Sequence, residues 1–188
     1  TLYEPNWSRR GMWNKSYYEA RVPRVPAMLL ELLSHQNFAD MRYGLDPRFR
    51  FTVSRAVYKG MLQFLCSQYN MDYVVQPLPV DHLALQFTGD NEVELTWQPV
   101  EDSLEPTAKA EKYIVYTRIG DGDFDNGTLV EGTSYRTNIS SGTIHSYKVV
   151  AVNKGGLSFP SGILSVGQPF QSKCTVLVVN GFDRIRAP

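Results

Sequence analysis

The chain has 188 residues, which is enough for one large domain or two small domains with real cores. Lys plus Arg and Asp plus Glu each number 19, so the formal net charge is zero and no basic field is available to hold a nucleic-acid backbone. Hydrophobic residues make up 43% and aromatic residues 12%, which excludes a disordered chain, and no apolar run reaches the roughly 20 residues of a membrane-spanning helix.

The chain begins with TLYEPNW, without an initiator Met, and it stops shortly after an apolar run. We therefore expect both ends to be internal to a longer protein, whose missing N-terminus could have carried a targeting segment. Cys66 and Cys174 are far apart in segments of different character. This arrangement predicts two buried free thiols rather than a disulfide framework or a zinc pattern.

The segment VPAMLLELLSHQNFAD, residues 25–40, opens with an apolar run. The lack of clean alternation over Ala27–Leu33 predicts a strand that is covered on both faces. One carboxylate, Glu31, stands inside this run towards its carboxyl end, where ligands bind in α/β sheets. Glu31 could be a functional group, or it could reach solvent or pair with Arg21 or Arg24.

The segment DPRFRFTVSRAVYKGMLQFLCSQYN predicts an amphipathic helix that lies on a sheet. Asp46 is a good N-cap, Pro47 suits the first helical position, and Asn70 closes the pattern. Apolar residues recur every three to four positions, at Phe49, Val53, Val57, Met61 and Phe64 or Leu65. The polar face carries Arg50, Arg55, Lys59 and Gln63. A strand followed by a helix predicts that residues 1–73 belong to an α/β sheet domain.

A proline-containing linker, residues 74–79, precedes a change in the sequence pattern from helical to alternating. From 80 to 167, short alternating segments such as EVELTW, KYIVYTRI and HSYKVVAVN are separated by the turn sequences GDGDFDNG, SSG and NKGG. This pattern predicts an antiparallel sandwich of two sheets. Residues 168–188 contain one strand-like run, Thr175 to Val179, and are expected to form a linker and the start of a further segment.

The order Trp97, Tyr113, then Tyr147 in SYKVVAVNKGGLSFPS resembles a fibronectin type III domain. The resemblance implies that Trp97 fills the core from the second strand. It also implies that Tyr147, on the sixth strand, makes the tyrosine corner. We therefore expect these aromatic side chains to be core residues rather than binding residues.

Six features between residues 7 and 69 resemble the C-terminal part of the zinc-dependent N-acetylmuramoyl-L-alanine amidases. In chain order they are Arg10-Gly11, Pro26-Ala27, Glu31, Asn37, Asp40 and the segment DPRFR. The resemblance implies that Glu31 is the catalytic acid/base, which stands beside a zinc-bound water and passes its proton to the leaving amine. It also implies that Arg10 binds substrate.

Two departures from that family are visible in this sequence. Leu33-Ser34 stand where the family usually has Gly-Phe. The zinc ligands of the family, two His and one Glu, are expected upstream of this chain, which supplies no metal ligand of its own. His35, His82 and His145 are not at ligand spacing, and each is interpreted as a surface or loop histidine.

The predicted fold is therefore an α/β fragment, the last strand and helix of an amidase-like domain, followed by an all-β fibronectin type III sandwich. The predicted function is part of an exported cell-wall hydrolase, in the periplasm or at the cell surface, that cleaves the amide between N-acetylmuramic acid and L-alanine of peptidoglycan. Its expected partners are peptidoglycan and the upstream part of the same protein, without nucleic acid or a membrane span. The chain alone is expected to be inactive, and residues 1–73 are expected to fold only against that upstream part.

Two alternatives stay open. One is a non-catalytic envelope protein that binds glycan or peptide through a decayed amidase-like domain. The other is a fibronectin-bearing carbohydrate-active enzyme, such as a polysaccharide lyase, whose chemistry lies in other domains.

Overall fold

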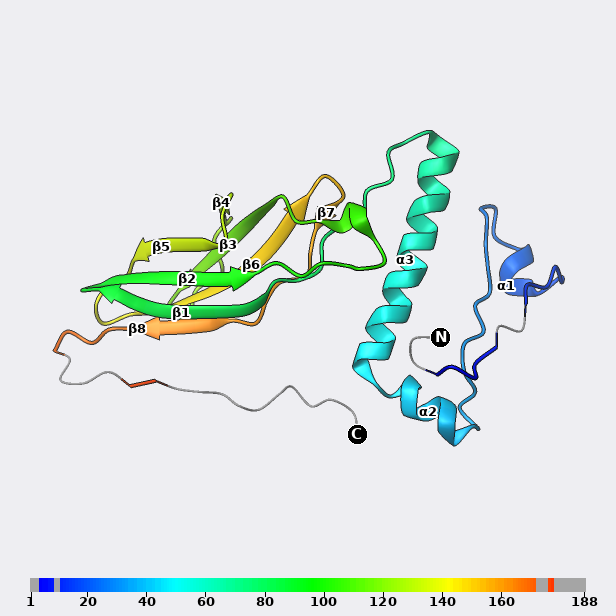
Figure 1. Ribbon diagram of the computed structural model, residues 1–188, viewed down its shortest axis with the longest axis horizontal. Helices are drawn as coiled ribbons and strands as arrows, with labels where there is room; N and C mark the ends of the chain where they lie inside the picture. Colours follow the sequence, from blue (N-terminus) through cyan, green and yellow to red (C-terminus); the bar gives the residue numbers. More distant parts are fainter. Residues whose placement is uncertain (1–3, 9–10, 172–175, 178–188) are drawn as a thin grey trace. The chain divides into compact units, whose positions relative to one another are not determined.

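The computed structural model (Figure 1) describes residues 4–8, 11–171 and 176–177. The chain falls into two compact units that divide after Arg50. The first unit contains the short helices α1 (Tyr18–Arg21) and α2 (Phe38–Gly44). Its main packing is a group of three aromatic rings, in which Tyr43 and Phe49 lie 4.7 and 5.6 Å from the ring of Trp7. No described residue before Phe49 is buried.

Helix α3 (Pro47–Tyr69) forms where the amphipathic pattern predicts it. The Oδ1 atom of Asp46 accepts a hydrogen bond from the backbone N–H of Arg48 at 2.9 Å, which caps the N-terminus as expected. At the other end, Asn70 has a φ of 51° in the left-handed region that closes helices. The thiol of Cys66 is buried near this end, as predicted, whereas Cys174 lies outside the described residues.

The predicted strand over Ala27–Leu33 is not formed by this chain. The structure describes these residues without regular secondary structure, because a strand exists only where a neighbour accepts its backbone hydrogen bonds. The apolar side chains from Ala27 to Leu32 are exposed to solvent, Met28 by 73% and Leu30 by 51%. The α/β part of the predicted fold is therefore not confirmed.

The second unit is dominated by an antiparallel two-sheet sandwich, as predicted (Figure 1). One sheet has the strand order β1-β2-β5, and the other has the order β4-β3-β6-β7 with β8 also pairing with β6. The strands are β1 (Asp81–Gly89), β2 (Glu92–Gln98), β3 (Lys112–Ile119), β4 (Thr128–Val130), β5 (Ser134–Asn138), β6 (Ile144–Asn153), β7 (Gly156–Leu157) and β8 (Leu164–Gly167). A short 3-10 helix, Pro106–Ala108, lies between β2 and β3.

The sandwich core contains the aromatic residues that the sequence placed there. Trp97 on β2 and Tyr113 on β3 are buried, and their rings meet edge-on with centroids 5.3 Å apart. Tyr147 on β6 is fully buried among the same residues. Inward residues alternate with outward ones along β2 and β3, which is the period-two pattern that predicted these strands. Residues 81–167 therefore form a sandwich that resembles a fibronectin type III domain.

Two details of the prediction are wrong. The hydroxyl of Tyr147 makes no hydrogen bond to any described residue, so the corner bond expected of this tyrosine is absent. His145 is not a surface histidine, because it lies on an inward position of β6 with 4% of its surface exposed. Its Nε2 atom accepts a hydrogen bond from the backbone N–H of Ser140 at 3.1 Å, and burial lowers its pKa.

Candidate functional site

Glu31, the carboxylate predicted to be catalytic, lies on exposed chain between α1 and α2. It makes no hydrogen bond or ion pair with the described residues, so the predicted alternative pairing with Arg21 or Arg24 is not formed. Arg10, the predicted substrate-binding residue, lies outside the described residues. In this chain Glu31 is therefore a solvated carboxylate.

The residues that follow Glu31 in the amidase-like motif fold a compact turn. The Oδ2 atom of Asp40 accepts a hydrogen bond from the backbone N–H of Ser34 at 2.9 Å. The Oδ1 atom of Asn37 accepts one from the N–H of Ala39 at 3.0 Å and so caps α2. Two of the motif's polar residues thus fix the backbone directly after Glu31.

The described residues do not form a group of three or more His, Cys, Asp and Glu side chains that could hold a metal ion. His35 is exposed in a turn, as predicted. His82, on β1, is also exposed, and its Nδ1 atom lies 3.5 Å from the carboxylate of the adjacent Asp81. The side chains present in the described structure therefore do not fit a zinc site by themselves.

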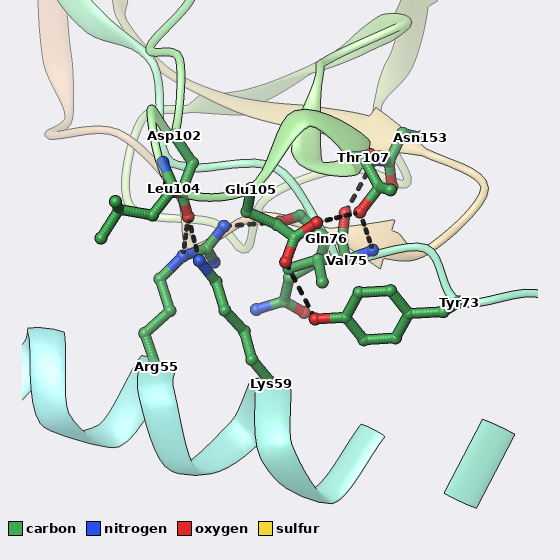
Figure 2. Close-up of polar contacts among 10 residues, drawn as sticks. All are labelled: Arg55, Lys59, Tyr73, Val75, Gln76, Asp102, Leu104, Glu105, Thr107 and Asn153. Atoms are coloured by element: carbon green, nitrogen blue, oxygen red, sulfur yellow. Dashed lines mark hydrogen bonds and ion pairs between the residues drawn. The ribbon is translucent and has the colours of Figure 1, made fainter. Parts of the chain in front are cut away.

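A second polar group joins α3 to the sandwich inside the second compact unit. Figure 2 shows Arg55 and Lys59, one turn apart on α3, reaching the carboxylate of Asp102 in the loop after β2. The Oδ2 atom of Asp102 lies 2.9 Å from Arg55 Nε and 2.7 Å from Lys59 Nζ. The three side chains are only 9 to 18% exposed, so solvent screens these ion pairs less than it screens surface pairs.

The same group continues into the segment between α3 and β1 (Figure 2). The hydroxyl of Tyr73 donates to Glu105 Oε2 at 2.9 Å, and the hydroxyl of Thr107 donates to Glu105 Oε1 at 2.7 Å. The backbone N–H of Val75 in turn donates to Thr107 Oγ1 at 3.1 Å. Val75 is fully buried, so the predicted linker 74–79 is packed against the sandwich rather than being a free connection.

Asn153, at the end of β6, connects three backbone segments. Its Nδ2 atom donates to the carbonyl oxygens of Val75, Thr107 and Lys109 at 2.8, 3.1 and 3.2 Å. Its Oδ1 atom accepts from the N–H of Gly155 at 2.8 Å. We call Arg55, Lys59, Tyr73, Asp102, Glu105, Thr107 and Asn153 the junction cluster.

The charges of the junction cluster stabilise one another. Burial would raise the pKa of Asp102, but hydrogen bonds from Lys59, Arg55 and the N–H of Leu104 outweigh burial and lower it. Burial would also raise the pKa of Glu105, but hydrogen bonds from Thr107 and Tyr73 outweigh burial and lower it. Burial and the hydrogen bond to Glu105 raise the pKa of Tyr73 to about 12. The cluster is thus built around ionised carboxylates.

The sequence identified the members of this cluster only in part. Arg55 and Lys59 were assigned to the polar face of α3, and Asn153 fell in the turn expected after the sixth strand. The sequence did not identify Asp102, which Arg55 and Lys59 share as a partner. The only signal for it was that two cations one turn apart on a helix can hold a single carboxylate between them.

Comparisons with known proteins add to this description. No family model and no curated protein matches the chain. Among solved structures, it matches the twitchin kinase region of C. elegans with 21% identity and a TM-score of 0.44, over 50% of this chain and 17% of that one. It matches a fourth FNIII domain of human origin with 20% identity and a TM-score of 0.45, over 53% and 85%.

A fibronectin type III domain of human collagen XX also matches, with 20% identity and a TM-score of 0.38, over 50% of this chain and 96% of that one. Because identity and TM-score are low in all three matches, the sandwich is identified by its own strand order and core. No helix among the described residues is both long enough and apolar enough to cross a membrane.

Proposed function

We propose that this chain is the C-terminal part of the catalytic domain of a zinc-dependent N-acetylmuramoyl-L-alanine amidase, followed by a fibronectin type III module. The protein would be exported and would act on peptidoglycan in the periplasm or at the cell surface. The observation that carries the proposal is the ordered set of motif features around Glu31. Asn37 and Asp40 of that set fold the turn directly after the carboxylate, as residues that position it would do.

In this proposal Glu31 takes a proton from the attacking water and passes it to the nitrogen of L-alanine, which leaves as an amine when the amide bond breaks. The side chain is exposed and has no hydrogen-bond or ion-pair partner among the described residues, so water can reach the carboxylate. Zinc ligands would come from the upstream part of the protein, since the described residues do not fit the metal alone.

The test is Glu31→Gln in the full-length enzyme, with hydrolysis of muropeptide as the readout. We expect activity to fall by roughly 10²- to 10⁴-fold, the range typical of a lost general acid–base group, with zinc content unchanged. The matched control is Glu19→Gln, which removes a carboxylate from exposed α1 in the same compact unit. Activity equal to the parent enzyme would reject the catalytic role of Glu31 and favour the binding-protein or lyase alternatives.

The fibronectin-like sandwich has a separate role in this proposal, as a spacer held at a fixed angle to α3. Two cations on α3 and one carboxylate on the sandwich supply directional, partly buried contacts, and Asn153 fixes the connecting segment. A free linker would allow the module to rotate. The junction cluster instead makes the helix and the sandwich move together.

A further inference from the structure

His145 is a buried titratable side chain that the proposed function does not use. It lies on an inward position of β6 with 4% of its surface exposed, and it pairs in the register with Ile119 on β3 and Val166 on β8. Its Nε2 atom accepts a hydrogen bond from the backbone N–H of Ser140 at 3.1 Å. An accepting Nε2 places the proton of the neutral imidazole on Nδ1. The backbone of the turn before β6 therefore holds this ring in its neutral form.

The turn that supplies this donor, residues 139–142, is also bound to the turn between β1 and β2. The backbone N–H of Ile139 donates to the carbonyl oxygen of Asn91 at 2.8 Å. The hydroxyl of Ser141 donates to Oδ1 of the same asparagine at 2.9 Å. The 139–142 turn leads from β5 in one sheet to β6 in the other, so these two bonds anchor the crossing to the end of the first sheet.

The segment that follows β8 is bound to both turns. The backbone N–H of Gly142 donates to the carbonyl oxygen of Gln168 at 2.7 Å, and Oε1 of Gln168 accepts the N–H of Asn91 at 3.2 Å. A Cβ on Gly142 would lie 2.7 Å from Cζ of Phe170, so this segment lies directly against the 139–142 turn. We call Asn91, Ser140, Ser141, Gly142, His145 and Gln168 the exit network.

Among the described residues, no charged side chain is placed to compensate a proton on this imidazole. Burial is the cause that shifts the pKa of His145, and it lowers it. Tyr147, the next inward residue of β6, is neutral because its pKa is raised to about 12 by burial and by Tyr135 of the opposite sheet. The charged residues of the neighbouring segments are on outward strand positions or in exposed loops: Glu92, Arg118 and Lys148, and Asp90, Asp121, Asp123 and Asp125.

Protonation reverses the role of Nε2, because both nitrogens of an imidazolium are donors. The N–H of Ser140 would then face a second N–H, and a charge would be buried without a partner. We propose that His145 is a proton-operated switch, whose neutral form holds the segment after β8 against the sandwich and whose protonated form releases the 139–142 turn together with that segment. The switch is on the sandwich and depends neither on Glu31 nor on the proposed hydrolysis.

The sign of the switch follows from burial. Because the pKa of His145 is lower in the folded chain than in the unfolded chain, the hold is fully present above the ordinary value of about 6.5 and is lost as pH falls through the folded pKa. Carboxylates ordinarily titrate near pH 4, so mild acid changes the imidazole before it changes them. Release of the segment after β8 is therefore expected in mildly acidic solution.

The test follows the His145 ring and backbone amide exchange by NMR on the whole chain, from about pH 7.5 to about pH 5, a range that brackets the ordinary pKa of histidine. We expect the protection of the Asn91, Ser140 and Gly142 amides, corrected for the intrinsic effect of pH on exchange, to fall roughly two- to tenfold, the factor that one lost hydrogen bond gives. The fall should share its midpoint with the ring titration. The core amide of Val149, which donates to Ser161 Oγ, should show no such fall, which separates local release from unfolding.

His145→Gln tests the titration itself, because the side-chain oxygen of Gln can accept the Ser140 N–H but does not titrate. Its exit-network amides should keep constant protection over the same range of pH. The matched control is His35→Gln, which removes an exposed imidazole from the turn before α2 and should leave the pH dependence of the parent intact.

Two results would overturn the proposal. One is constant protection of the exit network in the parent while the His145 ring titrates. The other is the same fall in protection in His145→Gln as in the parent. If His145→Gln does not fold, the parent decides alone, and different midpoints for the ring and for the Ser140 amide reject the switch.

Discussion

Tyr73 and Tyr147 both have a pKa raised to about 12, and burial is the main cause for both. They differ in their surroundings, because the hydroxyl of Tyr73 is also hydrogen-bonded to Glu105. The hydroxyl of Tyr147 is buried without a partner among the described residues. A satisfied buried hydroxyl stabilises a fold, whereas an unsatisfied one carries an uncompensated desolvation cost.

Tyr147→Phe should therefore leave the stability of the chain unchanged or raise it by up to about 1 kcal/mol. Tyr73→Phe removes the same atom but breaks the bond to Glu105, so it should cost about 1 kcal/mol. Urea unfolding of the two variants beside the parent chain measures both effects. A loss of stability in Tyr147→Phe would mean that its hydroxyl has a partner.

Gly155 is a second position where a change of one atom should alter the stability of the chain, because a substitution adds a Cβ atom there. A Cβ at Gly155 would collide with the carbonyl of Val74 and approach the carbonyl carbon of Val75 to 2.8 Å. These are backbone atoms of the packed segment between α3 and β1, so they cannot turn aside as a flexible side chain would. The glycine is needed because the turn after β6 touches that segment.

Gly155→Ala should consequently destabilise the chain by about 1–3 kcal/mol, the usual cost of overpacking. Gly132→Ala is the control, since nothing lies within 4 Å of its Cβ. The melting temperatures of the two variants provide the comparison. Equal melting temperatures would show that the packed segment can move away from the turn.

At the scale of elements, α3 uses its polar face to contact the sandwich. Its Arg55 and Lys59 bind Asp102, while Met61 and Leu65 of the apolar pattern are 59% and 46% exposed. The helix is joined to its neighbour by these charges together with one aromatic contact, in which the rings of Phe51 and Phe159 have centroids 6.4 Å apart. The part of the attachment that the ion pairs supply should depend on pH and on salt, unlike the core of the sandwich.

Asp102→Asn keeps the size of the side chain but removes the charge that Arg55 and Lys59 share. We expect it to cost about 1.5–3 kcal/mol, the range for hydrogen bonds to charged groups. Glu131→Gln, which breaks an exposed ion pair with Lys112, should have no measurable effect. Hydrogen exchange of α3 amides measures the change, and unaltered protection in Asp102→Asn would mean that the ion pairs contribute nothing to the attachment.

The sign of the pH dependence follows from the lowered pKa of Asp102. Because its pKa is lower in the folded chain than in the unfolded chain, its stabilisation is fully present above the ordinary value of about 3.9 and is lost as pH falls through the folded pKa. Protection of α3 should therefore be constant from neutral pH to about pH 5 and decrease below about pH 4. The Asp102→Asn variant should lack this decrease, apart from the part contributed by Glu105, whose pKa is also lowered.

Some of these elements could be predicted because their signals are local. The N-cap at Asp46 and the helical period of α3 each depend only on residues within or next to the helix. The alternation of β3 likewise depends only on the residues of that strand. The pairing of Arg55 with Asp102 could not be predicted, because 47 residues separate them and exposed charges of either sign are common. The prediction of a strand over Ala27–Leu33 is not confirmed for a related reason. The apolar pattern is typical of a buried strand, and the described residues of this chain do not cover it.

At the scale of the whole molecule, the two compact units differ in how much apolar surface they bury. The sandwich encloses a continuous core, which includes Trp97, Tyr113 and Tyr147. None of the described residues before Phe49 is fully buried, and the large apolar residues from Val25 to Leu32 are exposed. An apolar run of this kind is typical of a surface that another polypeptide covers.

The last prediction follows from this difference. If upstream polypeptide pairs with residues 25–33, as the proposed function requires, amides of this run should exchange rapidly in the chain alone and slowly in the full-length protein. Amides of β6 should be protected equally in both, because the core of the sandwich is closed without a partner. Hydrogen exchange with mass spectrometry compares the two proteins directly. Rapid exchange of residues 25–33 in the full-length protein would contradict the amidase proposal, since a catalytic Glu31 must be held on an ordered strand to act as an acid and a base.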